Sequence, residues 1–207
     1  MVRAGVFAAP RGPVPDDIDV TPSTLLSLLP NLITLARLIA VPLMIYVLLE
    51  EAFIFAFWLF LAAGVSDAVD GLIAKQFGAV TEIGAYLDPI ADKALLVSVY
   101  VTLGHLGVIE PWLVILIVSR DLMIVGGAIL FQTLTQSLKM EPLWISKVNT
   151  AFQIVLVLVV LGKSGFGITQ PWITETLTWA VAATTILSGG AYIYKWGLRA
   201  LDMEGDL

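Results

Sequence analysis

Six apolar stretches, each about 20 residues long, constrain the fold of this chain more than any other feature of its sequence. A helix of roughly 20 apolar residues is long enough to cross the hydrocarbon core of a bilayer. The links between the stretches are short and carry charges or prolines, so no soluble domain fits between them. The pattern therefore predicts an all-α membrane protein with six transmembrane helices. These are expected at about residues 32–49, 52–74, 84–103, 111–134, 145–162 and 172–196.

The composition favours lipid over water as the main solvent. Hydrophobic residues make up 58% of the chain, charged residues make up 14%, and the mean hydropathy is +0.93. A soluble domain averages about 45–50% apolar and about 25% charged residues. The chain has no cysteine and one histidine, His105, which excludes disulfides, thiolate metal sites and histidine-based metal centres. A bound metal would need oxygen ligands, which suit hard ions such as magnesium, manganese or calcium.

The ends of the chain differ from the apolar middle. Residues 1–20 are acidic and rich in proline, which predicts a disordered cytoplasmic tail, and residues 201–207 predict an acidic C-terminal tail. Between them we expect one membrane domain over residues 21–200, beginning with a short amphipathic surface helix at residues 21–30. No transit peptide is recognised, which favours a bacterial inner membrane.

The basic residues predict the orientation in the membrane. Loops on one side hold Lys163 alone, and the other side holds six basic residues near the span ends. Lysine and arginine are enriched on the cytoplasmic side, so both termini are expected there. The six residues are Arg3, Arg11, Lys75, Lys139, Lys195 and Arg199.

Four aspartates lie inside predicted spans, where charge is expensive. Asp67 and Asp70 share one helix face, and Asp88 and Asp92 share a face of the next span. At about 2.5–3.5 kcal/mol per charge, the four would cost on the order of 10 kcal/mol. If the two spans are antiparallel neighbours, the four carboxylates lie at one depth near the cytoplasmic side. Carboxylates crowded in this way cannot all stay ionised without cations, so bound divalent ions are the simplest compensation.

A pair of oxygen-bound metal ions indicates displacement at phosphorus, and a carboxylate at the edge of the cluster can act as general base. Gly71, Ala74 and Gly84 leave the acidic face open to a bulky polar substrate, although small residues also allow helices to pack closely. Two other classes remain. A divalent-cation transporter would also place acids in a membrane, but more often near the midplane on broken helices. A catalytically silent scaffold would tolerate loss of the aspartates.

The run from Asp67 to Asp92 resembles the signature of the CDP-alcohol phosphotransferase family. That signature is D-x2-D-G-x2-A-R-x8-G-x3-D-x3-D, and every spacing matches. The one departure is Lys75, where the family usually has arginine. Lysine keeps the charge but loses the bidentate fork of a guanidinium. Residues 30–37 are similar to the start of the first span in both the phosphatidylglycerophosphate synthase and the cardiolipin synthase branches of this family. Residues 119–121 and 145–153 are most similar to cardiolipin synthases of the eukaryotic type, which also occur in some bacteria.

The resemblance implies a homodimer of six-span subunits with a polar cavity open to the cytoplasm. It implies that Asp67, Asp70 and Asp88 are the principal ligands of two Mg2+ or Mn2+ ions. Asp92 would complete the cluster and deprotonate the acceptor hydroxyl, which attacks the β-phosphorus of CDP-diacylglycerol and releases CMP. The residues implied to bind the CDP-lipid are Asn31, Thr34, Gly71, Ala74 and Lys75, with Gly84 of the motif beside them.

The sequence also bears on the acceptor. The glycerol-phosphate branch of the family typically has a second arginine eight residues after that of span four, but eight residues after Arg120 lies Ala128. This favours a lipid acceptor, phosphatidylglycerol, over glycerol 3-phosphate, which remains the alternative. No nucleic-acid partner is expected.

The candidate contacts of the acceptor phosphate are Arg120, Lys147 and Arg37. Each also has a structural interpretation: Arg120 could pair with Asp121, Lys147 could anchor a span end, and Arg37 could pair with an aspartate. Lys93, about 100° round the helix from Asp92, is expected to pair structurally.

Overall fold

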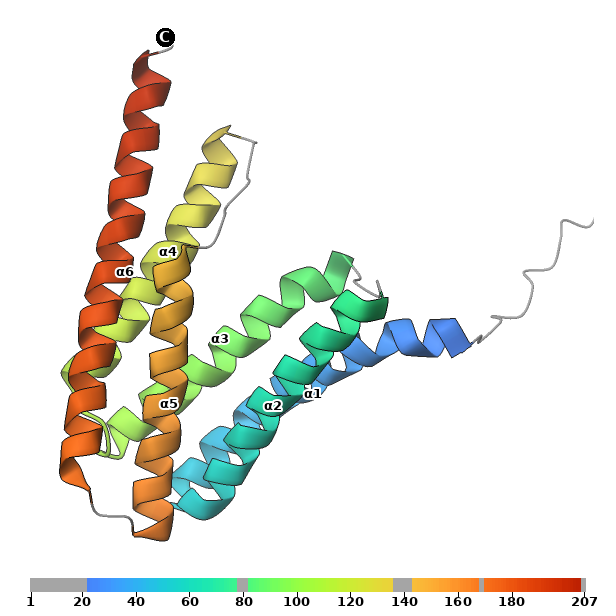
Figure 1. Ribbon diagram of the computed structural model, residues 1–207, viewed down its shortest axis with the longest axis vertical. Coiled ribbons are helices and arrows are strands. Elements are labelled where there is room, and N and C mark those ends of the chain that lie inside the picture. Colours follow the sequence, from blue (N-terminus) through green and yellow to red (C-terminus); the bar gives the residue numbers. More distant parts are fainter. Residues whose placement is uncertain (1–21, 78–81, 136–142, 168–169, 206–207) are drawn as a thin grey trace, which may run out of the picture.

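A computed structural model describes residues 22–77, 82–135, 143–167 and 170–205, with side chains for residues 33–67, 90–127, 143–167 and 170–195. These residues form six α-helices and no strand, so the predicted all-α class is confirmed for the described part of the chain. The helices are α1 (Pro22–Leu49), α2 (Phe53–Phe77), α3 (Glu82–His105), α4 (Pro111–Thr135), α5 (Trp144–Phe166) and α6 (Pro171–Gly205). Figure 1 shows that α1, α2 and α3 form one group and α4, α5 and α6 another, and that the groups meet at one end and diverge toward the other.

The helix boundaries follow local chemistry. Helices α4 and α6 begin at Pro111 and Pro171. Proline is favourable there because a backbone N–H in the first turn has no hydrogen-bond acceptor within the helix. Gly167 closes α5 in the left-handed conformation, with φ 69°, and its N–H donates to the carbonyl of Lys163. Between α1 and α2, Glu51 has a φ of 55° in a tight turn. These turns set the helices antiparallel with short connections.

Two boundaries differ from the sequence prediction. Residues 22–30 are helical, but α1 continues through Pro30 to Leu49, so no separate surface helix is distinguished. The loss of one backbone N–H at Pro30 does not end this helix. At the other end of the chain, α6 continues to Gly205 and takes in most of the predicted acidic tail. The predicted tail at residues 1–20 lies outside the described residues.

Among the described residues, α5 alone is long and apolar enough to qualify as a membrane span by length and hydropathy. Ile33–Leu49 and Phe53–Asp67 are shorter apolar helical segments. The outer surface nevertheless carries large apolar side chains on several helices, including Ile39, Ile115 and Leu122, each more than 60% exposed.

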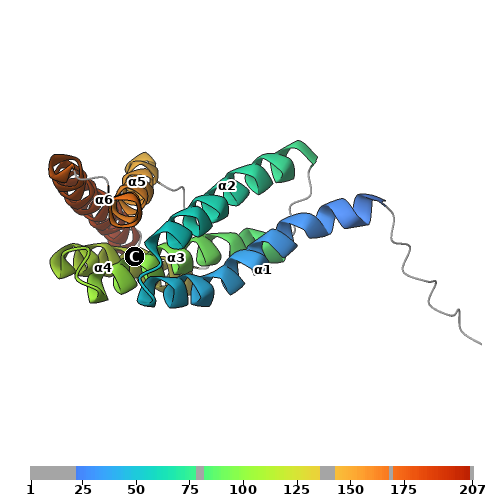
Figure 2. The same ribbon diagram turned by 90° about the horizontal axis from the view of Figure 1, so that it is seen from below.

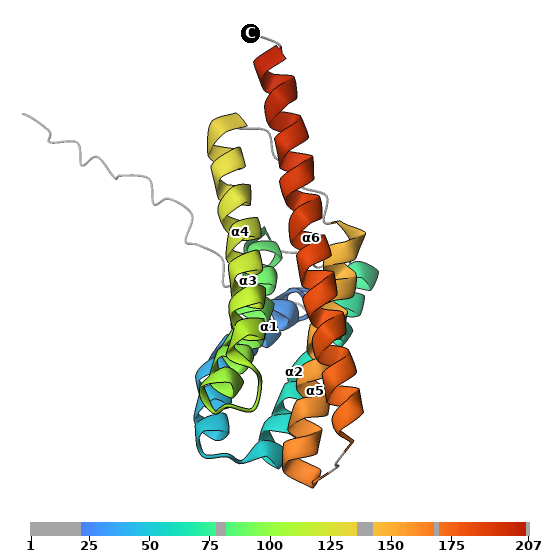
Figure 3. The same cartoon turned by 90° about the vertical axis from the view of Figure 1, so that its left-hand side faces the viewer.

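The packing order corrects one premise of the sequence analysis. We expected α2 and α3 to be direct neighbours, but among the described residues each packs against α1 and neither packs against the other. On their other side, α2 and α3 both contact α5, and α6 packs against α4 and α5. Figure 2 shows α1, α2 and α3 on one side of the molecule and α4, α5 and α6 on the other. Figure 3 shows α4 and α6 running beside each other.

The buried apolar core lies toward the end of the bundle where the helix groups meet. Its largest side chains include Met44, Tyr100, Leu113 and Leu156, all fully or almost fully buried. Here α2 and α5 approach closely: a Cβ added to Gly165 would lie 2.9 Å from the backbone nitrogen of Ile54. A glycine permits that approach because it has no Cβ.

Candidate functional site

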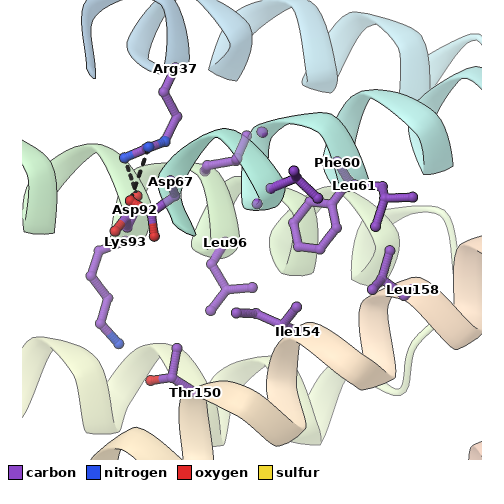
Figure 4. Close-up of a pocket in the computed structure, with 14 residues that line it drawn as sticks. Arg37, Phe60, Leu61, Asp67, Asp92, Lys93, Leu96, Thr150, Ile154 and Leu158 are labelled. Carbon is purple, nitrogen blue, oxygen red and sulfur yellow. Dashed lines mark hydrogen bonds and ion pairs between the residues drawn. The ribbon is translucent and has the colours of Figure 1, made fainter. Parts of the chain in front are cut away.

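A cavity of about 470 Å³ lies between α2, α3 and α5. Its head is charged, with Arg37 from α1, Asp67 from α2, and Asp92 and Lys93 from α3. Figure 4 shows these side chains at one end and Phe60, Leu61 and Leu158 at the other. The cavity is therefore amphiphilic, with a polar head and an apolar body. The rest of the lining is Ala63, Gly64, Val65, Leu95, Leu96, Thr150 and Ile154.

Arg37 joins the two aspartates at the head of the cavity. One terminal nitrogen lies 3.0 Å from an oxygen of Asp67, and the other lies 2.5 Å from an oxygen of Asp92. The Arg37 side chain is 3% exposed, whereas the carboxylates of Asp67 and Asp92 are 45% and 41% exposed. The guanidinium therefore closes the site from the α1 side and leaves both carboxylates accessible from the cavity.

Two members of the predicted cluster contact the same arginine. Asp67 and Asp92 come from separate helices and meet at one level, as their helical positions predicted. They meet through Arg37 rather than through direct packing of α2 on α3. Asp70 and Asp88 lie on α2 and α3, but their side chains are outside those described.

The chemistry of the donors fits a hard divalent cation. Carboxylate oxygens are the ligands that magnesium and manganese prefer, and two of the four predicted carboxylates face the same space. Within the described side chains, no group of three or more acidic residues or histidines is gathered. A complete ligand set would therefore need Asp70 and Asp88.

A second charged cluster lies beside the first and reaches into α4. Asp121 accepts a hydrogen bond from Lys93 at 2.6 Å through one oxygen and from Arg120 at 2.7 Å through the other. Asp121 and Arg120 are almost completely buried, while the Lys93 side chain is 35% exposed. The predicted pairing of Lys93 is confirmed, and its partner is Asp121. The internal ion pair considered for Arg120 and Asp121 is also present.

Arg120 fastens α4 to α5 and α6. Its second terminal nitrogen donates to the hydroxyls of Ser146 on α5, at 2.7 Å, and of Ser188 on α6. The guanidinium carbon lies 6.0 Å from the centre of the Tyr192 ring, within the range of a cation–π contact. Both terminal nitrogens of Arg120 thus have protein partners.

The other predicted site residues are distributed differently. Thr34 is buried on α1, one turn before Arg37. Lys147 is exposed near the start of α5 and does not line the cavity. The side chains of Asn31, Gly71, Ala74, Lys75, Gly84 and Ala128 lie outside those described.

Sequence reasoning missed two features of the site. Thr150 and Ile154 bring α5 into the cavity wall, and Ser188 of α6 holds Arg120. A span of mixed apolar residues gives no sign of which face meets a cavity. A lone serine in a helix is equally uninformative, because it usually bonds its own helix backbone.

The cavity has two carboxylates and two cations at one end and apolar side chains at the other, and it lies in an all-helical scaffold that exposes large apolar side chains. The chain belongs to the CDP-alcohol phosphatidyltransferase family, whose model matches residues 27–187. The matched segment includes every residue of the predicted site. Enzymes of this family generally depend on divalent metal ions.

Relatives of two kinds resemble the chain. It is 36% identical over 187 residues to the chloroplastic CDP-diacylglycerol–glycerol-3-phosphate 3-phosphatidyltransferase 1 of Oryza sativa, covering 81% of this chain and 56% of the relative. It is 30% identical over 194 residues to the CMP-forming cardiolipin synthase of Homo sapiens, covering 86% of this chain and 64% of the relative. It is 32% identical over 169 residues to the CDP-diacylglycerol–glycerol-3-phosphate 3-phosphatidyltransferase of Rickettsia bellii, covering 79% and 92%. The chain thus spans less than two thirds of the rice and human proteins.

Proposed function

We propose that this protein transfers the phosphatidyl group of CDP-diacylglycerol to a hydroxyl of a glycerol-containing phosphate acceptor. The acceptor oxygen forms a bond to the β-phosphorus, the bond between that phosphorus and the bridging oxygen breaks, and CMP leaves with the electron pair. The observation that carries the proposal is the pair Asp67 and Asp92, accessible at the head of an apolar cavity. Family membership supports the reaction type.

Four aspartates would hold two Mg2+ or Mn2+ ions: Asp67, Asp70, Asp88 and Asp92. Bound ions would neutralise the negative charge of the diphosphate and of the displaced oxygen. The exposed carboxylates of Asp67 and Asp92 support this assignment for two of the four positions. Asp92 would also take the proton of the acceptor hydroxyl, as a general base within hydrogen-bond reach. Arg37 would position both carboxylates from the α1 side of the site, because its buried guanidinium contacts each of them.

The CDP-lipid would lie against α1, α2 and the start of α3. Asn31, Thr34, Gly71, Ala74, Lys75 and Gly84 are the proposed contacts, carried over from the family motif. Lys75 would meet a phosphate as a point charge, because an ammonium lacks the fork of arginine.

Glycerol 3-phosphate is the acceptor that the comparisons favour. The rice relative has a higher identity to the chain than the human cardiolipin synthase, and the chain covers 92% of the Rickettsia relative, whose name also specifies glycerol 3-phosphate. These similarities support our proposal that the protein is a phosphatidylglycerophosphate synthase.

Phosphatidylglycerol is a second candidate, which would make the protein a cardiolipin synthase. The apolar part of the cavity does not separate the two acceptors, because the acyl chains of CDP-diacylglycerol need an apolar environment in either reaction. The predicted phosphate contacts favour phosphatidylglycerol. Arg37 and Arg120 already have protein partners, and a monoanionic phosphodiester requires less positive charge than a phosphate dianion.

The protein would lie in a membrane as a homodimer, with six spans per subunit and both termini in the cytoplasm. The exposed apolar side chains and the distribution of lysine and arginine support the membrane location and the orientation. A bacterial inner membrane is the proposed location.

An acceptor competition tests these proposals. Protein purified in detergent receives CDP-diacylglycerol, Mg2+ or Mn2+, and either phosphatidylglycerol or glycerol 3-phosphate, and CMP is measured. Release with one acceptor alone identifies that branch. Absence of CMP with both acceptors, together with nucleotide-independent ion flux in liposomes, would instead establish a cation transporter.

A further inference from the structure

Lys93 combines accessibility with unused hydrogen-bond donors. An ammonium has three donors, and within the described part of the chain one of them has a partner, Asp121. The rest of the side chain faces the cavity, where Figure 4 shows it beside Asp92 and extending toward Thr150 of α5. A cation with free donors in a mostly apolar cavity is costly unless an anion meets it.

The carboxylates of Asp67 and Asp92 also lie at this end of the cavity, but they pair with Arg37 and are assigned to the bound cations in the proposed reaction. Asp121 is shared, because its second oxygen accepts from Arg120, so the group of Lys93, Asp121 and Arg120 carries one net positive charge. The second terminal nitrogen of Arg120 is bonded to Ser146 and Ser188. Arg120 is buried and does not line the cavity, so Lys93 is the member of this group that presents the excess charge to a ligand.

The position of Lys93 restricts which anion it can meet. The acceptor hydroxyl must come to Asp92 to lose its proton, and Lys93 is the next residue along α3. Lys93 also faces α5 and the apolar body of the cavity, away from the α1 side closed by Arg37. In a glycerol phosphate the hydroxyl and the phosphate are separated by only a few bonds. A phosphate attached to that acceptor therefore falls near the Lys93 ammonium.

We propose that Lys93, held in place by Asp121, binds the phosphate of the acceptor. Lys93 makes the contact, and Asp121 is a positioning residue that keeps the ammonium at the cavity wall. The ligand is a glycerol phosphate, either the phosphodiester of a lipid headgroup or a free phosphomonoester. This inference rests on the proposed transfer reaction and assigns to Lys93 a role that Arg120 and Lys147 were expected to fill.

The experiment compares Lys93→Gln and Lys93→Arg with a control variant, Lys163→Gln. Lys163 is an exposed lysine in the last turn of α5 and does not line the cavity. Kinetics are measured with phosphatidylglycerol in mixed micelles and with glycerol 3-phosphate in solution. A hydrogen bond to a charged group contributes roughly 10- to 100-fold to binding. Lys93→Gln should raise the KM for the accepted acceptor by about that factor, with kcat and the KM for CDP-diacylglycerol nearly unchanged. Lys93→Arg should restore most of the affinity, and Lys163→Gln should match the wild type.

If the KM rises for phosphatidylglycerol, Lys93 binds a lipid phosphodiester, and if it rises for glycerol 3-phosphate, Lys93 binds a free phosphomonoester. If Lys93→Gln leaves the acceptor KM unchanged, or raises only the KM for CDP-diacylglycerol, the inference is wrong. Neither result affects the proposed reaction. If the wild type releases no CMP with either acceptor, the proposed function itself fails.

A measurement on the wild type covers the case in which Lys93→Gln does not fold. Amine-reactive labelling is followed by mass spectrometry, with and without saturating acceptor in the absence of CDP-diacylglycerol. The acceptor should protect Lys93 and leave Lys163 labelled to the same extent. Equal labelling of Lys93 under both conditions would overturn the inference.

Discussion

Replacing Arg120 by methionine tests whether this buried arginine holds helices together or contacts the substrate. The substitution removes hydrogen bonds to three oxygen-bearing side chains, Asp121, Ser146 and Ser188, which lie on α4, α5 and α6. Removing one partner of a buried ion pair costs about 3–5 kcal/mol. Asp121 keeps Lys93 as a partner, so we expect the lower value, about 3 kcal/mol. For a chain of this size each kcal/mol lowers Tm by about 2–4 °C, which gives a loss of roughly 6–12 °C.

The assay is thermal unfolding of the purified protein in detergent, with Arg120→Lys and Lys163→Met measured in parallel. Arg120→Lys should fall between the wild type and Arg120→Met, because one ammonium keeps the charge but cannot reach all three partners. Lys163→Met, at an exposed position, should leave Tm unchanged. The KM for the acceptor, measured well below Tm, should be that of the wild type in Arg120→Lys, which keeps the positive charge, and in Lys163→Met. A raised acceptor KM with an unchanged Tm would refute this reasoning and make Arg120 a substrate contact.

Three further predictions follow from the close helix contact and from the carboxylates. Gly165→Ala should lower the free energy of unfolding by about 1 kcal/mol, because the added Cβ meets the backbone of Ile54 and overpacking outweighs the gain in helix propensity. At Gly64 a Cβ would meet no atom within 4 Å, so Gly64→Ala should raise the free energy of unfolding by about 0.5–1 kcal/mol. If chemical denaturation gave the same change for both variants, the close approach of Gly165 to Ile54 would be contradicted. Asp92→Asn should reduce CMP release by roughly 10²- to 10⁴-fold. Tm should change little, because Arg37 still has Asp67 as an ion-pair partner. Substantial remaining activity would exclude Asp92 as the general base. Chelation of divalent ions should abolish turnover, and added Mg2+ or Mn2+ should restore it; turnover in excess chelator would show that the ions are not required.

The helices, and the position of Asp67 and Asp92 along their helix axes, could be predicted because both depend on residues that are close together in the sequence. Apolar stretches of sufficient length form helices, and a rise of about 1.5 Å per residue fixes depth along each one. The contact of both aspartates with Arg37 could not be predicted, because it depends on which helix lies between α2 and α3. Arg37 of α1 fills that place, and one sequence does not distinguish an arginine that bridges two carboxylates from one that binds phosphate.

The role of α5 was also beyond the sequence. Hydropathy alone predicted a span there, but not which of its faces borders a cavity. Helices α2 and α5 touch near Ile54 and Gly165, and farther along them the cavity is lined by Gly64 of α2 and Thr150 of α5. Such divergence depends on side chains that are distant in the chain, so no local pattern signals it.

The walls of this cavity have a consequence for how the enzyme meets its substrates. Val65 of α2 and Ile154 of α5 line the cavity and are also exposed on the apolar outer surface. In the proposed membrane location, that edge joins the cavity to the bilayer interior, so a lipid arrives and leaves by lateral diffusion within one leaflet. The quantity that governs turnover is then the mole fraction of substrate among the surrounding lipids, not its molar concentration in the sample. Diluting the membrane with inert lipid would slow such an enzyme even when the total amount of substrate is constant.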